Sequence, residues 1–324
     1  MKKRKSLLLS VVSVMLVFLL SGCEMAELVV FNPKGPQAEK ILDLINWSLV
    51  WIGLIMVVVI ALFVYIVWKY RARPDNADYE PPQEKGNHLV EIIWTAIPFI
   101  IVVILMVPTV TTLFDLEEVP AGYEDQEPLV IHATSADWKW IFSYPEQNIE
   151  TINYVNIPVN RPVLFKLTSA GTMQSFWIPA LSGQKYTMAK METELYIVAD
   201  HEGSYFGRNS NFNGKGFKEM EFEVLAQSPQ DFDKWVKEVQ EKAPKLTEEM
   251  YAEKLKPSHL GRETFSNTHL EWVDHADHHA KEYLNPELYR VHGYPGKTFT
   301  DENNDIDNDT ENSDHHHGGD HSGH

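Results

Sequence analysis

The chain has 324 residues, of which 44% are hydrophobic and 23% charged, and its formal net charge is −18. Such a charge repels nucleic acid unless a basic patch exists. No cluster of lysine or arginine follows Arg73, so nucleic acid is excluded as a partner. Cys23 is the single cysteine. One cysteine excludes an intrachain disulfide and any metal site that needs two thiolates from this chain. The length predicts two or three folded units.

The first 22 residues have the features of an export signal. A basic segment, Lys2–Lys5, precedes the apolar run Leu7–Leu20, which is too short to span a bilayer. The sequence Leu20-Ser21-Gly22-Cys23 then resembles a bacterial lipoprotein signal, in which the cysteine thiol carries lipid such as palmitate. An ordinary signal peptide with an incidental cysteine is the alternative. We expect cleavage after residue 22, lipidation at Cys23 and an exported N-terminal segment over residues 23–43.

Two further apolar segments are long enough to cross a membrane. Leu44–Trp68 and Ile92–Phe114 contain no charged side chain, and at about 1.5 Å per residue each exceeds a hydrocarbon core of about 30 Å. Buried core helices of a soluble protein are the alternative. Loop 69–91 carries four lysine and arginine residues and is therefore expected in the cytoplasm, because the bias of lysine and arginine sets the orientation. Residues 44–114 are thus predicted to form a two-helix hairpin with both ends exported. The basic residues of the loop are Lys69, Arg71, Arg73 and Lys85.

Residues 128–226 are predicted to form an exported β domain. Nine short strand-like runs separated by turn residues are typical of a Greek-key sandwich. From Ser228 a helical extension is expected to residue 256, because proline at the first helical position follows a serine cap. Residues 257–324 are expected to form a tail, disordered from about residue 301, where acids abound without lysine or arginine. The runs are 129–134, 138–144, 152–158, 163–168, 175–179, 186–191, 194–199, 204–207 and 220–225.

Four motifs in this order resemble those of subunit II of haem–copper oxidases. Residues 90–98 read V-E-I-I-W-T-A-I-P, and residues 137–140 read D-W-K-W. Residues 174–179 read Q-S-F-W-I-P, similar to the family's H-S-F-x-x-P. Residues 207–220 are similar to its G-x-C-x-E-x-C-x-x-x-H-x-x-M loop. The resemblance implies an α+β membrane protein, with a two-helix transmembrane hairpin, a cupredoxin-like Greek-key β-sandwich and a helical or disordered C-terminal tail.

In the cytochrome c oxidase branch of that family, the last two motifs bind a dinuclear copper centre. At the matching positions this chain has amides, a phenyl ring and one thioether. An amide does not bridge copper as a thiolate does, and phenylalanine has no lone pair to donate. We therefore expect no metal and no cofactor on this chain, a hydrogen-bonded plug of amides, and a methionine that fills the core. The positions are Gln174 and Phe217 (histidines in the family), Asn209 and Asn213 (cysteines), Asn211 (the carbonyl ligand) and Met220 (the methionine).

A subunit II without that copper resembles the quinol oxidase branch. The resemblance implies an oxidoreductase complex that oxidises membrane quinol and reduces oxygen to water with proton pumping. Its redox chemistry resides on subunit I, which carries the haems and copper B, and subunits III and IV complete it. Membrane lipid is a further partner and cytochrome c is not. This chain would be a scaffold for subunit I, located in the bacterial cell membrane.

Two questions remain open at the level of sequence. Glu91 has an implied role at the entrance of a proton-uptake path into subunit I, although an interfacial acid that reaches water is the alternative. Trp138 and Trp140 are expected to serve in core and interface packing.

The alternative function is a membrane-anchored lipoprotein that binds copper or zinc through its His-rich tail, residues 315–324. A lipid anchor needs no second membrane attachment, so the hairpin favours the oxidase subunit.

Overall fold

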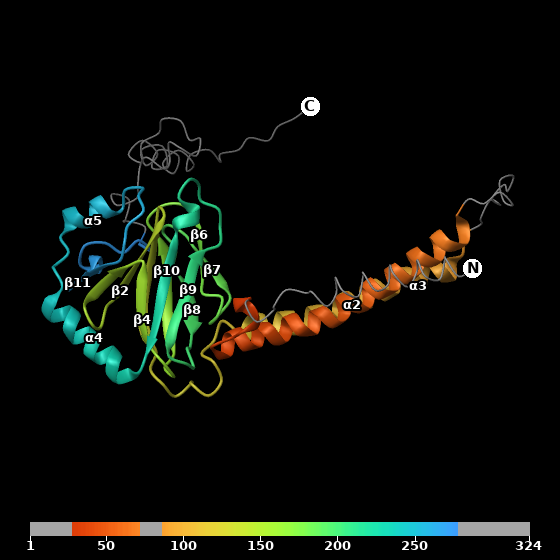
Figure 1. Cartoon of the computed structure of the whole chain (residues 1–324), viewed down its shortest axis with the longest axis horizontal. Helices are drawn as coiled ribbons and strands as arrows, with labels where there is room; N and C mark the ends of the chain where they lie inside the picture. The colour runs from red at the N-terminus through yellow and green to blue at the C-terminus, as the bar shows by residue number, and fades with distance from the viewer. Residues whose placement is uncertain (1–27, 72–85, 278–324) are drawn as a thin grey trace, which may run out of the picture.

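The two long helices precede the strands along the chain, and shorter helices follow most of the strands. The computed structural model describes residues 28–71 and 86–277 (Figure 1). The helices are η2 Val29–Phe31, α2 Pro36–Tyr70, α3 His88–Asp115, η4 Phe217–Glu219, α4 Pro229–Lys242, α5 Glu248–Lys254 and η5 His269–Glu271. The strands are β1 Leu129–Ala136, β2 Lys139–Tyr144, β3 Ile149–Ile152, β4 Tyr154–Pro158, β5 Val163–Ser169, β6 Gln174–Trp177, β7 Gln184–Thr187, β8 Thr193–Ile197, β9 Gly203–Asn209, β10 Glu221–Gln227 and β11 Glu263–Phe265.

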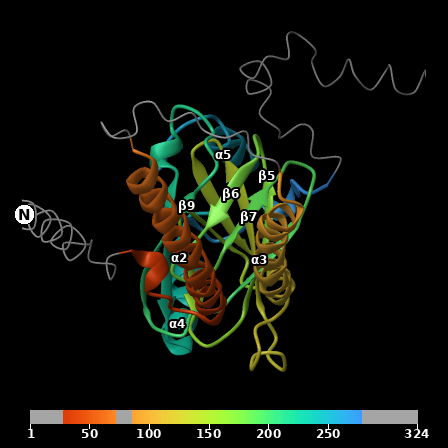
Figure 2. The ribbon, with the colours of Figure 1, turned by 90° about the vertical axis from the view of Figure 1, so that its right-hand side faces the viewer.

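The two long helices lie side by side and project from one side of the strands (Figures 1 and 2). Both are long and apolar enough to cross a membrane, by length and composition. The side chain of Asn87 caps α3, since its Oδ1 accepts from the backbone N of Leu89 at 3.1 Å. Helix α2 starts at Pro36, eight residues before the predicted apolar segment. Its first two turns mix polar and apolar side chains and are held on the sandwich by Gln37.

Two β-sheets pack face to face in a sandwich. One has the strand order β11-β3-β2-β1-β5-β8 and the other β4-β10-β9-β6-β7. Parallel pairs, β1 with β5 and β10 with β4, occur among antiparallel neighbours, which requires crossovers between the sheets. The predicted fold class, a helical hairpin followed by a Greek-key sandwich, is confirmed. One expected strand, 152–158, is instead β3 and β4. They are separated at Asn153, whose φ of 58° turns the chain from one sheet to the other.

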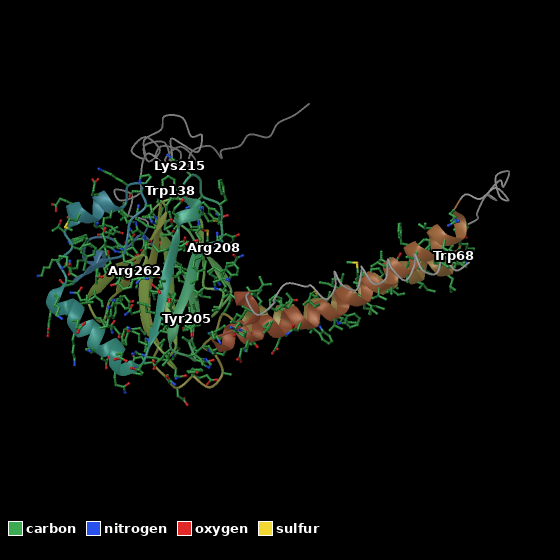
Figure 3. The ribbon with its side chains drawn as sticks, viewed as in Figure 1. Trp68, Trp138, Tyr205, Arg208, Lys215 and Arg262 are labelled. Atoms are coloured by element: carbon green, nitrogen blue, oxygen red, sulfur yellow. The ribbon has the colours of Figure 1, made fainter. Side chains whose placement is uncertain are left out.

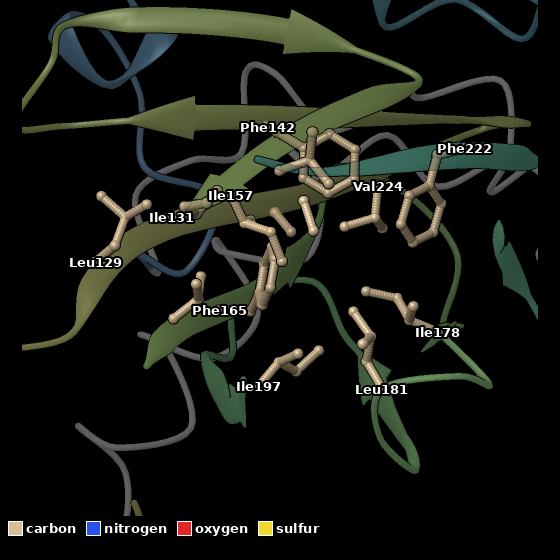
Figure 4. Close-up of a cluster of buried hydrophobic side chains, with 14 of the residues drawn as sticks. Leu129, Ile131, Phe142, Ile157, Phe165, Ile178, Leu181, Ile197, Phe222 and Val224 are labelled. Atoms are coloured by element: carbon tan, nitrogen blue, oxygen red, sulfur yellow. The ribbon is translucent and has the colours of Figure 1, made fainter. Parts of the chain in front are cut away.

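Aliphatic side chains and a group of aromatic rings fill the space between the sheets (Figure 4). The rings of Phe176 and Phe222 stack with centroids 5.0 Å apart, and Trp140 meets Phe176 edge-on at 5.1 Å. Gly207 lies against this stack, because a Cβ there would be 2.2 Å from the ring of Phe222. Such pairs contribute about 0.5–1.5 kcal/mol each beyond area burial. The core therefore holds the neighbouring end of β9 in a fixed place.

The base of the hairpin is attached to the sandwich by backbone contacts. The N–H of Asp200 donates to the carbonyl of Lys34 at 2.9 Å. Gln37 is 2% exposed, and its Nε2 donates to the carbonyl of Tyr196 at 3.1 Å. A Cβ at Gly35 would be 2.1 Å from a backbone oxygen, so only glycine fits this close approach. The hairpin and the sandwich therefore form one connected unit.

Residues 243–277, which we call the C-terminal strap, fold back onto the outer face of the six-stranded sheet. Strand β11 pairs with β3 and becomes the edge of that sheet. A second buried apolar cluster lies between strap and sheet. The sequence pattern did not predict β11 or η5, because three-residue elements show no periodicity. The cluster comprises Ala136, Ile141, Ile152, Ala170, Leu246, Tyr251, Leu255, Phe265 and Val273.

Candidate functional site

The structure brings the positions that match the family's copper ligands together at one end of the five-stranded sheet. Gln174 begins β6, Asn209 ends β9, and the two strands pair with Asn209 opposite Phe176. The chain then passes through a loop to Met220, just before β10. We call residues 209–220 the β9–β10 loop. In Figure 3 the labels of Trp138 and Lys215 mark this end of the sandwich.

Asn209 braces the β9–β10 loop from inside. Its side chain is fully buried, and its Oδ1 accepts from the backbone N of both Ser175 and Asn211 at 2.9 Å. Its Nδ2 donates to the carbonyl of Asn211 at 2.7 Å. Asn211 in turn donates from Nδ2 to the carbonyl of Met173 at 3.0 Å. The carbonyl that matches the family's ligating carbonyl is therefore hydrogen-bonded to an amide of this chain.

Asn213 and Met220 form a second contact across the same loop. Asn213 donates from Nδ2 to the Sδ of Met220 at 3.2 Å. Met220 is 1% exposed and belongs to the apolar core between the sheets. Its sulfur is thus held by a neighbouring amide and by packing, as an apolar side chain with weak acceptor capacity.

Gln174 and Phe217 do not join this network. The amide of Gln174 is fully buried, and neither its nitrogen nor its oxygen has a hydrogen bond to any residue that the structure describes. The expected plug of four amides is therefore wrong for Gln174. Phe217 packs against Phe212 at 5.4 Å between ring centroids, and the guanidinium of Arg208 lies 5.7 Å from its ring.

The donors at this end do not fit a dinuclear copper centre. Soft copper pairs need bridging thiolates and imidazole nitrogens. Here the nearest groups are amides engaged with backbone, a phenyl ring and a thioether already hydrogen-bonded to Asn213. We derive no chemical step through copper at this site.

Trp138 and Trp140 both serve in packing, Trp140 in the core between the sheets and Trp138 against the β9–β10 loop. Trp140 is fully buried in the aromatic core. Trp138 adopts φ 66°, a left-handed conformation that costs about 1–2 kcal/mol for a bulky residue. Its indole covers Gly216, where a Cβ would be 2.2 Å from the ring, and its Nε1 donates to the carbonyl of Asn213 at 3.3 Å. Trp138 therefore holds the β9–β10 loop closed.

Glu91 lies far from the β9–β10 loop, at the opposite end of the hairpin. It is in the first turn of α3, whereas Asp115 at the other end of that helix pairs with Lys40 near the sandwich at 3.1 Å. The Nδ1 of His88 is 3.6 Å from its carboxylate. An open, mainly apolar groove surrounds the carboxylate, lined by His88, Glu91, Ile92, Thr95, Ala96 and Phe99.

Several predicted residues lie outside the described part of the chain, namely Cys23, most of loop 69–91 and the His-rich tail. Of the remaining lone histidines, His201 is exposed and His132 half-buried. The pKa of His132 is lowered, chiefly because burial removes water from the imidazole. Over residues 28–71 and 86–277, no group of three or more His, Cys, Asp or Glu side chains is arranged to hold a metal ion.

A buried polar cluster under the strap was missed by the sequence reasoning. Glu150, His269 and His275 are all fully buried there. Nearby, Lys139 donates from Nζ to the carbonyl of Lys256 in the strap at 2.7 Å, and desolvation lowers its pKa to about 8. The signal available in the sequence was a charged side chain flanked by isoleucines in a short strand, as in Ile149–Ile152.

Comparison with known proteins identifies the family. The family model described as "Cytochrome C oxidase subunit II, transmembrane domain" matches residues 24–112. The chain is 52% identical to "Quinol oxidase subunit 2" of Bacillus cereus, over 85% of this chain and 94% of that protein. It is also 52% identical to the protein of that name in Bacillus subtilis, over 80% of each.

Among solved structures, the periplasmic domain of subunit II of cytochrome oxidase of Bradyrhizobium japonicum is 23% identical. The structural match covers 35% of this chain and 94% of the Bradyrhizobium japonicum chain, with a TM-score of 0.34. The identity to the Bacillus proteins, over most of both chains, decides the assignment. The chain belongs to the cytochrome c oxidase subunit II family, as a quinol oxidase subunit 2.

Proposed function

We propose that this chain is the copper-free subunit II of a terminal quinol oxidase, and that electrons reach the haems of subunit I without passing through it. The observation that supports this proposal is the chemistry of the β9–β10 loop. The positions of this loop that match the family's copper ligands carry side-chain amides that hydrogen-bond within the loop. The matching methionine, Met220, accepts a hydrogen bond from Asn213 through its sulfur. A chain of this construction serves as a scaffold.

The proposed complex oxidises quinol in the membrane and reduces oxygen to water with proton pumping. Subunit I carries the haems and copper B, and subunits III and IV complete the assembly. A quinol diffuses in the lipid and donates to subunit I directly, so cytochrome c has no role. The rigid joint between hairpin and sandwich supports the scaffold role, since Lys34, Gln37 and Asp200 fix one to the other.

In this proposal the sandwich is on the exported side of the bacterial cell membrane. The four lysine and arginine residues of loop 69–91 support this orientation, because loops that carry lysine and arginine stay in the cytoplasm. A lipid at Cys23 then supplies a second attachment beside the hairpin. Glu91 is placed at the cytoplasmic end of α3, where a half-exposed carboxylate in a mainly apolar groove suits the entrance of a proton-uptake path.

The experiment that tests the proposal is purification of the tagged full-length chain from membranes. We expect a haem-containing complex that oxidises a quinol analogue and shows no activity with reduced cytochrome c. Recovery of a haem-free monomer would contradict it. The metal-binding lipoprotein alternative is separated by deleting residues 301–324. Loss of the tail leaves quinol oxidation intact in our account, whereas it abolishes the function of a metal-binding lipoprotein.

A further inference from the structure

The turn between β1 and β2 places a tryptophan where the backbone favours glycine. The two strands pair with Ala136 opposite Lys139, which leaves a hairpin turn of two residues, Asp137 and Trp138. The second of them, Trp138, has a φ of 66°. A positive φ at this position suits glycine and is unfavourable for a bulky side chain. The turn therefore depends on contacts from elsewhere in the fold.

Lys139 supplies contacts that hold this turn. Its side chain is fully buried. Its Nζ donates to the carbonyl of Asp137 at 3.0 Å and to the carbonyl of Lys256, in the C-terminal strap, at 2.7 Å. Desolvation lowers its pKa to about 8, so at pH 7 Lys139 is still an ammonium with three donors. One buried side chain thus joins the turn to a segment 117 positions further along the chain.

The other side of the turn contacts the β9–β10 loop. The Nε1 of Trp138 donates to the carbonyl of Asn213 at 3.3 Å, and its indole lies where a Cβ on Gly216 would be. The loop in turn presents the ring of Phe212, which is 76% exposed and lies 5.4 Å from the ring of Phe217 between centroids. A continuous series of contacts therefore runs from the strap to an exposed aromatic side chain.

We propose that the C-terminal strap holds the β9–β10 loop closed through Lys139 and the Asp137–Trp138 turn. While the strap is in place, the ammonium of Lys139 fixes the turn in its left-handed conformation and keeps the indole on Gly216. When the contact with Lys256 is lost, Trp138 relaxes to an ordinary φ and its indole leaves the loop. The strap thereby controls the order of the surface that the loop presents.

The inner part of the loop has a separate attachment. Asn209 accepts from the backbone N of Ser175 and Asn211, and these contacts do not involve the turn. Opening should therefore be confined to the outer part of the loop. Its reporters are backbone N–H groups that donate within the loop, those of Phe217 to Gly214 at 3.2 Å and of Glu219 to Gly216 at 3.2 Å.

The test is hydrogen exchange of the complete chain, purified in detergent at pH 7. Lys139→Met keeps an apolar side chain of similar length and removes all three donors. We expect protection of peptides spanning 213–220 to fall about tenfold to hundredfold, because a buried hydrogen bond from a charged donor contributes about that factor. Protection of β5, which lies outside the series of contacts, should fall less.

The matched control is the same substitution at a neighbouring lysine of the strap. The Nζ of Lys254 pairs with Glu263 at 2.5 Å and lies 5.7 Å from the ring of Phe265, so its printed partners are all in the strap. Lys254→Met should loosen residues 248–265 and leave the β9–β10 loop as in the wild type.

A double substitution separates transmission through the turn from a general loss of stability. Trp138→Phe keeps a ring but loses the donor to Asn213, so it should loosen the loop by itself. Adding Lys139→Met should then have less effect than it has in the wild type, because both act through one contact.

Three results would overturn the proposal. They are a ratio of loop to β5 protection in Lys139→Met equal to that of the wild type, an equal loosening of the loop by Lys254→Met, and independent effects of Lys139→Met and Trp138→Phe. If Lys139→Met fails to fold, Lys139→Gln, which is too short to reach both carbonyls, takes its place in the same three comparisons.

Discussion

Replacement of Glu150 by alanine tests how the strap is held. In the structure one carboxylate oxygen accepts three hydrogen bonds, from the hydroxyl of Ser143 and from the ring and backbone nitrogens of His269. Glu150→Ala leaves all three donors buried without that acceptor. Removing one partner of a buried, hydrogen-bonded pair costs about 3–5 kcal/mol. Opening of the strap should therefore become easier by roughly two to four orders of magnitude.

The assay is hydrogen exchange at pH 8, read separately for strap peptides and for β5. Protection of residues 263–277 should fall by that factor, with little change in β5. Glu146→Ala, at an exposed glutamate of the β2–β3 turn, is the matched control and should stay within about 0.5 kcal/mol of wild type. Strap protection in Glu150→Ala equal to that of Glu146→Ala would refute the reasoning.

Three other substitutions follow from the geometry. Gly216→Ala places a methyl group against the indole of Trp138 and should destabilise the chain by about 1–3 kcal/mol, seen as a lower Tm. Gly261→Ala, with nothing within 4 Å, is its control, and equal Tm values would contradict the packing. Burial lowers the pKa of Lys139 to about 8 from 10.5, so wild-type stability should rise between pH 8 and 10.5 in denaturant titrations. Lys139→Met should remove that rise, and an unchanged rise would assign it to another group. Glu91→Ala should lower quinol oxidase turnover severalfold in a fully assembled complex, and unchanged turnover would reject a proton-path role.

The hairpin and the sandwich were accessible from the sequence because their signals are local. An uncharged run of more than twenty residues has few alternatives to a membrane helix, and period-two alternation marks half-buried strands. The start of α2 was predicted less well, whereas the serine cap and proline that begin α4 were predicted correctly. Residues 36–43 mix polar and apolar side chains, and contacts such as that of Gln37 with the carbonyl of Tyr196 explain why α2 begins there.

The structure of the C-terminal strap could not be predicted from local sequence patterns. Its elements are short, and they are stabilised by contacts between residues more than 100 positions apart, such as that of His269 with Glu150. At the β9–β10 loop, the residue types alone predicted that copper does not fit. They did not predict that Asn209 braces the backbone while the side-chain amide of Gln174 has no hydrogen bond to a described residue, because amide orientation depends on the surrounding fold.

The copper content of the purified complex tests the central claim most directly. The account predicts copper only at the level of copper B, one atom per pair of haems, and a spectrum without the purple absorption of a dinuclear thiolate centre. Two additional copper atoms that remain with this chain when it is separated from the haem-bearing subunit would contradict the account.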